Sequence, residues 1–275
     1  MPYIVDALES IKNQEYKNYE LIIQDCLSDD ETIATIERYA SLNIKFVSES
    51  DTGIGDAYNK AVQRCSGDII GSIDADNLIE PKALSRVVHA FYTNDDDLAV
   101  LYGDVRMIEE DGTPKHLFQP GDFSLNKLLD MTLVPPYSTS FFSAKSCGDE
   151  LYYDPVLTTC ADFDLWLRLA DKKIQYLDKV LGFTRMSSKS MSCNASSYNQ
   201  FCIDKISAVE KYINNNPTNI VDIRKSKAGI YLWAAEHVFY LEGKSELFDT
   251  IYTKALDYIS PSNQRVLDFN TKFLD

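Results

Sequence analysis

The sequence of 275 residues is poor in basic side chains relative to acidic ones. Lysine and arginine together number 27 against 42 aspartates and glutamates, so the formal net charge is -15 and the pI is about 4.6. This balance argues against a nucleic-acid backbone as a partner and against docking on anionic lipid through a basic face. It leaves room for a phosphorylated small molecule, which needs only a local cation or a bound metal ion.

Zinc motifs and long apolar runs are also missing. None of the six cysteines forms a Cys-x-x-Cys pair, and the three histidines, His89, His116 and His237, are scattered along the chain. We therefore expect no zinc centre and mostly buried, reduced thiols. We find no signal peptide and no apolar run of the roughly 18 residues that span a bilayer. These features predict a cytoplasmic protein, one that could still visit a membrane surface through its substrate.

Glycine-rich phosphate loops are absent as well. Gly53-Ile54-Gly55 precedes an expected helix, but it lacks the further spacing of a dinucleotide-binding or Walker motif. Both a plain turn and a phosphate cradle at a helix start remain open for it. No glycine-rich basic loop lies near the N-terminus, which disfavours a nucleotidyltransferase.

The most informative segment runs from Gly71 to Asn77, where an apolar stretch ends in Asp74 and Asp76. If this segment is extended, the two carboxylates point the same way. Two carboxylates at the tip of a buried strand are costly to desolvate unless a positive group pairs with them. A hard divalent cation that carries a substrate diphosphate would do so. The alternative is a turn in which aspartate caps the next helix.

Strands alternate with helices over the first part of the chain, which predicts an α/β fold with a layered, mainly parallel sheet. We expect helices at 3–14, 32–40, 56–65 and 82–92, and strands at 18–25, 44–49 and 69–73.

The middle of the chain is richer in strands. We expect strands at 99–102 and 105–108 around a Gly103-Asp104 turn, and a hairpin tip at Asp111-Gly112. Further on we expect helices at 123–131 and 162–170 and strands at 138–143, 174–177 and 180–184.

Helical patterns dominate from about residue 196, at 198–214, 221–242 and 245–259. The last two predict a helical hairpin. These patterns divide the chain into a domain over 1–190 and a helical C-terminal region over 196–275. A lone hairpin cannot bury both of its faces, so it packs on the first domain or on a second subunit, as in a homo-oligomer.

Five blocks of sequence, taken in order, resemble glycosyltransferase family 2, the inverting enzymes with a GT-A (Rossmann-like) fold. They lie at residues 6–14, 16–25, 48–60, 67–76 and 161–169, and the resemblance covers roughly residues 3–185. It implies a GT-A-like nucleotide-sugar domain followed by the helical extension. Family members begin with an apolar strand and a polar turn before the helix that starts here near Tyr3. From that difference we expect the N-terminus to be incomplete.

The resemblance implies roles for several aspartates. Asp25 ends the second strand of the family, where the nucleotide base is contacted, and Asp51 falls in the loop that lines the nucleotide pocket. Asp74 and Asp76 match the Asp-x-Asp pair of the nucleotide-sugar site. The second member of that pair usually holds Mn²⁺ or Mg²⁺, with Asp74 as a further candidate ligand.

Asp162 matches the acidic residue that acts as the catalytic general base. The usual acidic residue immediately before it is Ala161 here, so Asp164 is a rival for the role. Helix capping is the alternative for both carboxylates.

The activity implied is inverting, metal-dependent transfer of a sugar, of the hexosyltransferase type, from a nucleoside diphosphate donor, a UDP-sugar first of all. The acceptor would be a hydroxyl in polysaccharide, glycolipid or glycoprotein synthesis. The alternative is a non-catalytic, degenerate glycosyltransferase-like module that binds partners. The sequence leaves the donor sugar, the acceptor and the linkage open.

Overall fold

The computed structural model describes the chain except residues 1–2, 29–30, 40, 94–96, 189 and 275. Its contacts divide the chain into two compact units. The first unit comprises residues 1–123, 135–158 and 169–186, and the second comprises 124–134, 159–168 and 187–275. The second unit therefore includes two segments, 124–134 and 159–168, from the range that the sequence assigns to the first domain.

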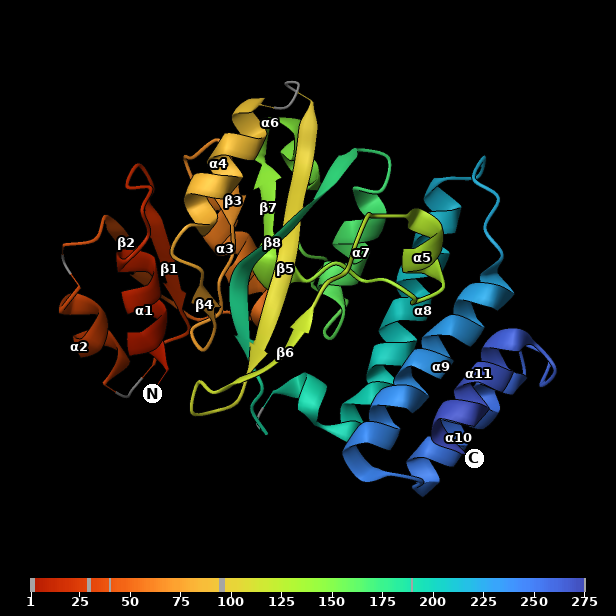
Figure 1. Cartoon of the computed structure of the whole chain (residues 1–275). Coiled ribbons are helices and arrows are strands. Elements are labelled where there is room, and N and C mark those ends of the chain that lie inside the picture. Colours follow the sequence, from red (N-terminus) through yellow and green to blue (C-terminus); the bar gives the residue numbers. More distant parts are fainter. Residues whose placement is uncertain (1–2, 29–30, 40, 94–96, 189, 275) are drawn as a thin grey trace. The chain divides into compact units, whose positions relative to one another are not determined.

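The first unit begins with two parallel strands and their covering helices (Figure 1). Strands β1 and β2 pair in register from Leu21↔Ile44 to Asp25↔Ser48 and form a two-stranded sheet of their own. Helix α1 buries Ile4 and Leu8, which form a core with Ile36 of α2 and the apolar side chains of both strands. The elements are α1 (Ile4–Lys12), β1 (Leu21–Asp25), α2 (Thr32–Glu37), β2 (Ile44–Ser48) and α3 (Ile54–Arg64).

The larger sheet of the first unit has the strand order β3-β7-β5-β8-β4 among the described residues, with β6 paired to β5. Of its described strands only β5 and β8 pair in parallel, so this sheet is mixed and the expectation of a mainly parallel sheet is wrong for it. One reason is that β5 and β6 are joined by a tight turn, which permits only antiparallel pairing. The strands are β3 (Ile69–Gly71), β4 (Leu78–Ile79), β5 (Leu98–Ile108), β6 (Pro114–Phe118), β7 (Ser140–Ser143) and β8 (Lys173–Arg185).

The predicted hairpin at Asp111-Gly112 is confirmed, because Glu109 N–H donates to the Thr113 carbonyl and Gly112 has a φ of 87°. The predicted turn at Gly103-Asp104 is wrong, since β5 runs straight through it. A Cβ on Gly103 would lie 2.6 Å from Leu181, so this glycine allows close packing of a neighbouring side chain. The two strands expected at 174–177 and 180–184 are likewise one irregular strand, β8.

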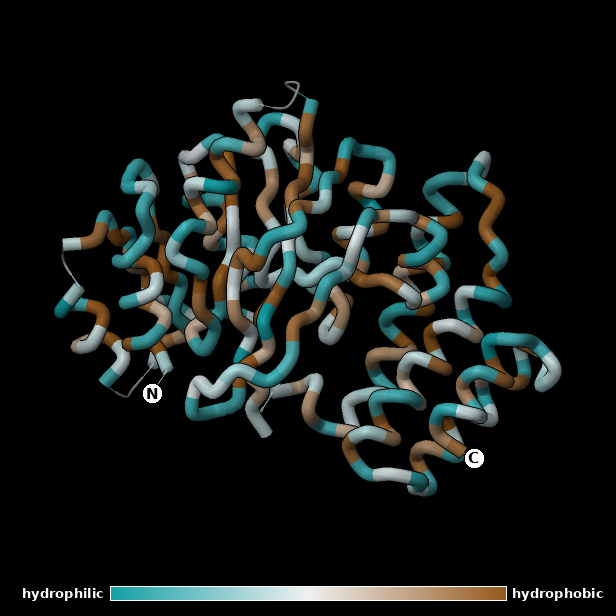
Figure 2. Tube along the Cα trace, viewed as in Figure 1, coloured by the Kyte–Doolittle hydropathy of each residue, from teal (hydrophilic) through white to brown (hydrophobic). Residues whose placement is uncertain are grey.

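Helix α4 (Ala83–Thr93) packs on this sheet through Ala83, Val87 and Ala90, which contact Leu101 of β5 and Leu181 of β8. Residues 99–102 of β5 are fully buried. Figure 2 colours much of the first half of this strand as hydrophobic. Helix α6 (Ala144–Cys147) follows β7.

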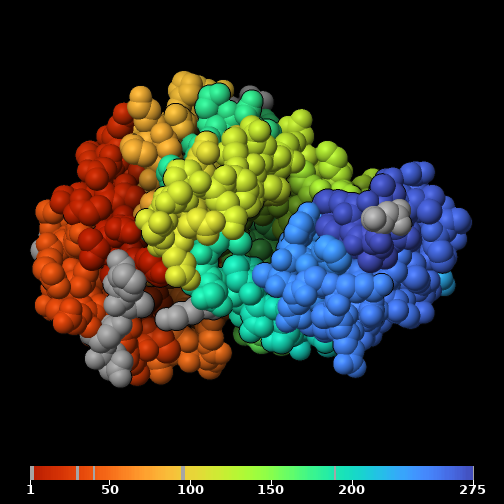
Figure 3. Space-filling view, turned by 60° about the horizontal axis from the view of Figure 1, so that its bottom comes forward, coloured from red at the N-terminus to blue at the C-terminus, as the bar shows by residue number. Residues whose placement is uncertain are grey.

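The second unit is helical. It contains α5 (Leu125–Leu129), α7 (Ala161–Arg168), α8 (Tyr198–Asn215), α9 (Ile223–Glu242), α10 (Glu246–Leu256) and α11 (Gln264–Phe273). Helix α11 was not predicted; its Phe269 stacks on Phe248 and Tyr252 of α10, so the expected hairpin carries a third helix. Figure 3 shows the C-terminal helices as one continuous blue body. Among the described residues no helix is long and apolar enough to cross a bilayer.

Candidate functional site

Strand β3 ends at Gly71, where a Cβ would lie 2.6 Å from the ring of Phe141 on the neighbouring strand β7. The chain then turns, because the Asn77 N–H donates to the Asp74 carbonyl at 3.0 Å. We call residues 74–77 the Asp-x-Asp turn. Of the two alternatives left open by the sequence, the extended segment that would point Asp74 and Asp76 the same way is therefore wrong, and the segment that carries them is a turn.

The two carboxylates of the Asp-x-Asp turn have different surroundings. The Asn77 side-chain amide donates to Asp74 Oδ2 at 2.9 Å, so Asp74 serves in part to hold the turn. The Asp76 side chain is half-buried, and its carboxylate forms no hydrogen bond or ion pair with any residue that the structure describes. Its backbone carbonyl, by contrast, accepts from Arg185 Nε at 3.0 Å. The turn thus fixes the backbone of Asp76 and leaves its carboxylate available.

Asp76 and Asp74 present oxygen donors of the kind that Mg²⁺ and Mn²⁺ prefer. Within the described part of the chain, no three histidine, cysteine or acidic side chains gather as a metal-binding group. The described residues therefore do not form a metal site built from protein ligands alone. One or two carboxylates do suit a hydrated divalent ion whose remaining ligands are substrate phosphates and water.

Asp25 lies at the end of β1 and is 8% exposed. Its carboxylate accepts from the hydroxyls of Ser28 at 2.5 Å and Ser48 at 2.6 Å, and from the Ser28 N–H at 3.0 Å. Burial acts to raise the pKa of Asp25, and these hydrogen bonds outweigh it, so the pKa lies below its ordinary value. Both oxygens of Asp25 therefore have partners inside the protein.

Asp51 lies in the loop before α3, where its Oδ1 accepts from the Gly53 N–H at 2.9 Å. Asp56 Oδ2 accepts from the Thr52 N–H at 3.0 Å and from Lys60 at 2.9 Å. Gly53 has a φ of 129°, a conformation that favours glycine at this point. Gly53 is thus the residue that precedes α3, its N–H is bonded to Asp51, and Ile54 and Gly55 belong to the first turn of the helix.

In the second unit, Asp162 and Asp164 both lie in the first turn of α7. Asp164 is 2% exposed and forms ion pairs with Arg168 Nε at 2.8 Å and Lys211 Nζ at 3.1 Å. Asp162 is half-buried, and its Oδ1 accepts from the N–H of the adjacent Phe163 at 2.8 Å. Asp164 therefore ties α7 to α8, whereas Asp162 carries no salt bridge within the described residues.

Sequence reasoning missed three residues that hold these aspartates, namely Asn77, Arg185 and Lys211. Asn77 directly follows Asp76, so a turn asparagine could have been expected there. Arg185 and Lys211 gave no local signal, because they lie 109 and 47 residues from their partners Asp76 and Asp164.

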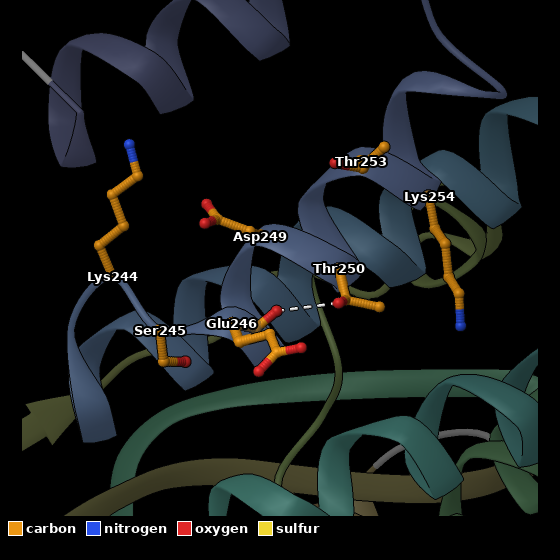
Figure 4. A pocket seen from close by; sticks show the side chains of 7 residues that line it. All are labelled: Lys244, Ser245, Glu246, Asp249, Thr250, Thr253 and Lys254. Atoms are coloured by element: carbon orange, nitrogen blue, oxygen red, sulfur yellow. Dashed lines mark hydrogen bonds between the residues drawn. The ribbon is translucent and has the colours of Figure 1, made fainter.

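A separate open depression of about 600 Å³ lies on the second unit at the start of α10 (Figure 4). Its lining mixes both signs of charge, with Lys244 and Lys254 beside Glu246 and Asp249. None of the six candidate aspartates lines it. We assign it no function.

Comparison with known proteins places these features in a family. The model of glycosyl transferase family 2 matches residues 1–146, which is more than half of the chain. The chain belongs to this family.

A chondroitin synthase of Escherichia coli is 28% identical over 246 residues, which cover 84% of this chain and 34% of that protein. An uncharacterized glycosyltransferase of Rickettsia conorii is 22% identical over 275 residues, with 97% of this chain and 44% of that protein covered. The chain thus spans about a third to a half of the length of these relatives.

Solved structures give the fold. S. aureus TarS 1-349, determined in complex with UDP-GlcNAc, aligns with a TM-score of 0.62 at 20% identity, over 98% of this chain and 80% of TarS 1-349. The mannosyltransferase PcManGT of Pyrobaculum calidifontis, determined with GDP-Man and Mn²⁺, aligns with a TM-score of 0.57 at 16% identity, over 98% and 79% of the two chains. The α/β, GT-A class expected from the sequence is confirmed.

Proposed function

We propose that this protein is an inverting glycosyltransferase that moves a sugar from a nucleoside diphosphate donor to a hydroxyl acceptor. Membership of family 2 supports the reaction class. The observation that carries the residue assignment is the Asp-x-Asp turn, which fixes the backbone of Asp76 and leaves its carboxylate without a protein partner in the described structure.

Asp76, with Asp74 beside it, is the proposed ligand of Mn²⁺ or Mg²⁺. Such an ion, when bound, stabilises the negative charge that develops on the leaving diphosphate. PcManGT, a structural neighbour, was determined with Mn²⁺. Asp76 would be the principal protein ligand, because Asp74 already accepts a hydrogen bond from Asn77.

Asp162 is the proposed general base. In an inverting transfer the acceptor oxygen bonds to the anomeric carbon of the sugar while the bond from that carbon to the diphosphate oxygen breaks. The proton of the acceptor hydroxyl passes to a carboxylate, which contributes about 10²–10⁴-fold to the rate. Asp164 is the weaker candidate, since both of its oxygens are engaged by Arg168 and Lys211.

The donor is proposed to be a UDP-sugar, with Asp25 and Asp51 on the nucleotide side of the site. TarS was determined with UDP and with UDP-GlcNAc, and PcManGT with GDP-Man. Because Asp25 already accepts bonds from Ser28 and Ser48, its proposed role is to hold these two serines in place rather than to bind the nucleotide alone. The acceptor remains a saccharide, a lipid-linked saccharide or a protein.

The test is a turnover assay of the purified chain with UDP-hexoses, UDP-N-acetylhexosamines and GDP-mannose, each with Mn²⁺ and with saccharide acceptors. We expect release of UDP from one donor, and a product anomer opposite to that of the donor by NMR. Folded protein that binds no nucleoside diphosphate and turns over no donor would contradict the proposal and favour the non-catalytic binding module.

A further inference from the structure

Arg185, the last residue of β8, is buried to 3% exposure and has contacts with three distant segments of the first unit. Its Nε donates to the backbone carbonyl of Asp76 at 3.0 Å. Its Nη1 donates to the Glu110 carbonyl at 2.7 Å, and its Nη2 forms an ion pair with Asp6 at 3.1 Å. The ring of Tyr3 lies 4.5 Å from the guanidinium carbon. The guanidinium therefore joins the Asp-x-Asp turn to the β5–β6 hairpin and to the start of the chain.

The backbone of Arg185 contacts the same turn. Its N–H donates to Asn77 Oδ1 at 3.0 Å, and the Asn77 amide group in turn donates to Asp74. Asn77 is 4% exposed, so the bond between Arg185 and Asn77 is shielded from water, whereas Asp74 at the other end of the network is exposed. Arg185 thus holds the turn at two points, once through its main chain and once through its guanidinium.

Burial of an arginine is costly unless its charge and its N–H groups find partners. Here the partners are three backbone carbonyls, those of Asp76, Glu110 and, at 3.5 Å, Glu109, together with the carboxylate of Asp6, whose side chain is 54% exposed. A neutral side chain could fill the same space without a buried charge, but it would leave the Asp76 and Glu110 carbonyls with one donor fewer. The fork of N–H groups that reaches separate acceptors in fixed directions is specific to arginine and is not supplied by lysine.

We infer that Arg185 is a positioning residue for the metal-binding carboxylate of Asp76. It fixes the carbonyl of Asp76, and so the peptide that follows, and with it the direction in which the Asp76 side chain leaves the turn. Arg185 itself does not contact the metal or the donor. This inference rests on the proposed function, in which Asp76 binds Mn²⁺ or Mg²⁺. It adds to that function a residue 109 positions away in the sequence.

The experiment measures the Mn²⁺ concentration that gives half-maximal binding of UDP, together with the affinity for UDP in EDTA and the melting temperature without metal. The variants are Arg185→Lys, Asp76→Asn and Arg86→Lys. Arg86, in helix α4, is the matched control. Like Arg185, it donates to a backbone carbonyl, that of Val180, and forms an ion pair with a carboxylate, that of Glu80.

For Arg185→Lys we expect the required Mn²⁺ concentration to rise roughly tenfold or more, the range found when a partner of a metal ligand is lost. The affinity for UDP in EDTA should stay as in the unmodified protein. Arg86→Lys should lower the melting temperature without any change in the Mn²⁺ requirement. A Mn²⁺ requirement that is unchanged in Arg185→Lys would overturn the inference and leave Arg185 a purely structural clamp.

Asp76→Asn separates the role of Arg185 from the metal-binding role of Asp76. If it abolishes Mn²⁺-dependent UDP binding while Arg185→Lys has no effect, only the role of Arg185 fails. If Asp76→Asn has no effect, the metal assignment fails and the inference fails with it. Should Arg185→Lys not fold, Asp6→Asn removes the exposed partner of the same guanidinium, and a two- to fivefold rise in the Mn²⁺ requirement is then expected. No rise in Asp6→Asn would overturn the inference.

Discussion

The two candidate pairs of aspartates, Asp74 with Asp76 and Asp162 with Asp164, have the same spacing, but the two units hold them differently. In the first unit, Asp74 is exposed and accepts a hydrogen bond from the neutral side-chain amide of Asn77. In the second unit, Asp164 is buried between two cations, Arg168 and Lys211. Each pair thus has one member engaged in structure, while Asp76 and Asp162 have no salt bridge in the described residues.

The difference shows that identical spacing does not imply identical energetics. A buried carboxylate between two cations leaves uncompensated charge when it is removed, which is expensive. An exposed carboxylate at a turn is solvated already, so its removal leaves no buried charge. We therefore expect the first unit to be less sensitive to the loss of Asp74 than the second unit is to the loss of Asp164.

The largest expected effect is on catalysis, from Asp162→Asn. Loss of the proposed base should lower kcat by about 10²–10⁴-fold with little change in the KM for the donor. The free energy of unfolding should change by less than about 1 kcal/mol, because Asp162 is half-buried and its hydrogen bond is with the N–H of the adjacent Phe163. Steady-state kinetics and denaturant unfolding check both parts, and retained kcat would show that Asp162 is not the base.

The next effect is on stability, from Asp164→Ala. We expect a loss of about 3–5 kcal/mol, since Arg168 and Lys211 would keep charges without their shared carboxylate. Urea unfolding of Asp164→Ala beside Asp162→Ala, on the same helix, provides the matched control. Equal destabilisation by the two changes would contradict the claim that Asp164, and not Asp162, stabilises the second unit through its ion pairs.

The smallest expected effect is on the pH dependence of stability, through the carboxylate of Glu20. The hydrogen bonds that Glu20 accepts, first from Lys45 and then from the Ser66 N–H, lower its pKa to about 2. Since the folded pKa lies below the unfolded value near 4.3, this stabilisation is present above about pH 4.3 and is lost as the pH falls toward 2. Lys45 is 49% exposed, so the gain should be below about 1 kcal/mol.

The check is the melting temperature measured between about pH 5 and pH 2. Glu20→Gln should show a shallower fall over this window than the unmodified protein, with Glu9→Gln, an exposed member of an i, i+3 pair, as the comparison. Parallel curves for Glu20→Gln and the unmodified protein would contradict the assignment.

The spacing of apolar residues along the sequence correctly predicted helices and strands that bury one side against the core. Ile4, Leu8 and Ile11 mark α1, and the alternation of helices with strands gave the α/β class. The failures have non-local causes. Gly103 reads as a turn residue, yet it lies within β5 because Leu181 packs against it from a strand far along the chain.

The same limit applies to the site. The six candidate aspartates could be named from their blocks, but their partners could not. The contact between Arg185 and Asp76 and the pairing of Lys211 with Asp164 depend on tertiary structure. These contacts give Asp164 and Asp74 partners that the sequence could not show, while the preference for Asp162 and Asp76 came from the family resemblance.

The most direct test of the account is calorimetric titration of UDP into the full chain with Mn²⁺, comparing Asp74→Asn with Asp76→Asn. We predict that Asp76→Asn loses the Mn²⁺-dependent binding, whereas Asp74→Asn retains it within a few-fold, with both variants folded. If both variants bind as the unmodified protein does, or if Asp74→Asn alone loses binding, the claim that the fold reserves Asp76 for the metal is wrong.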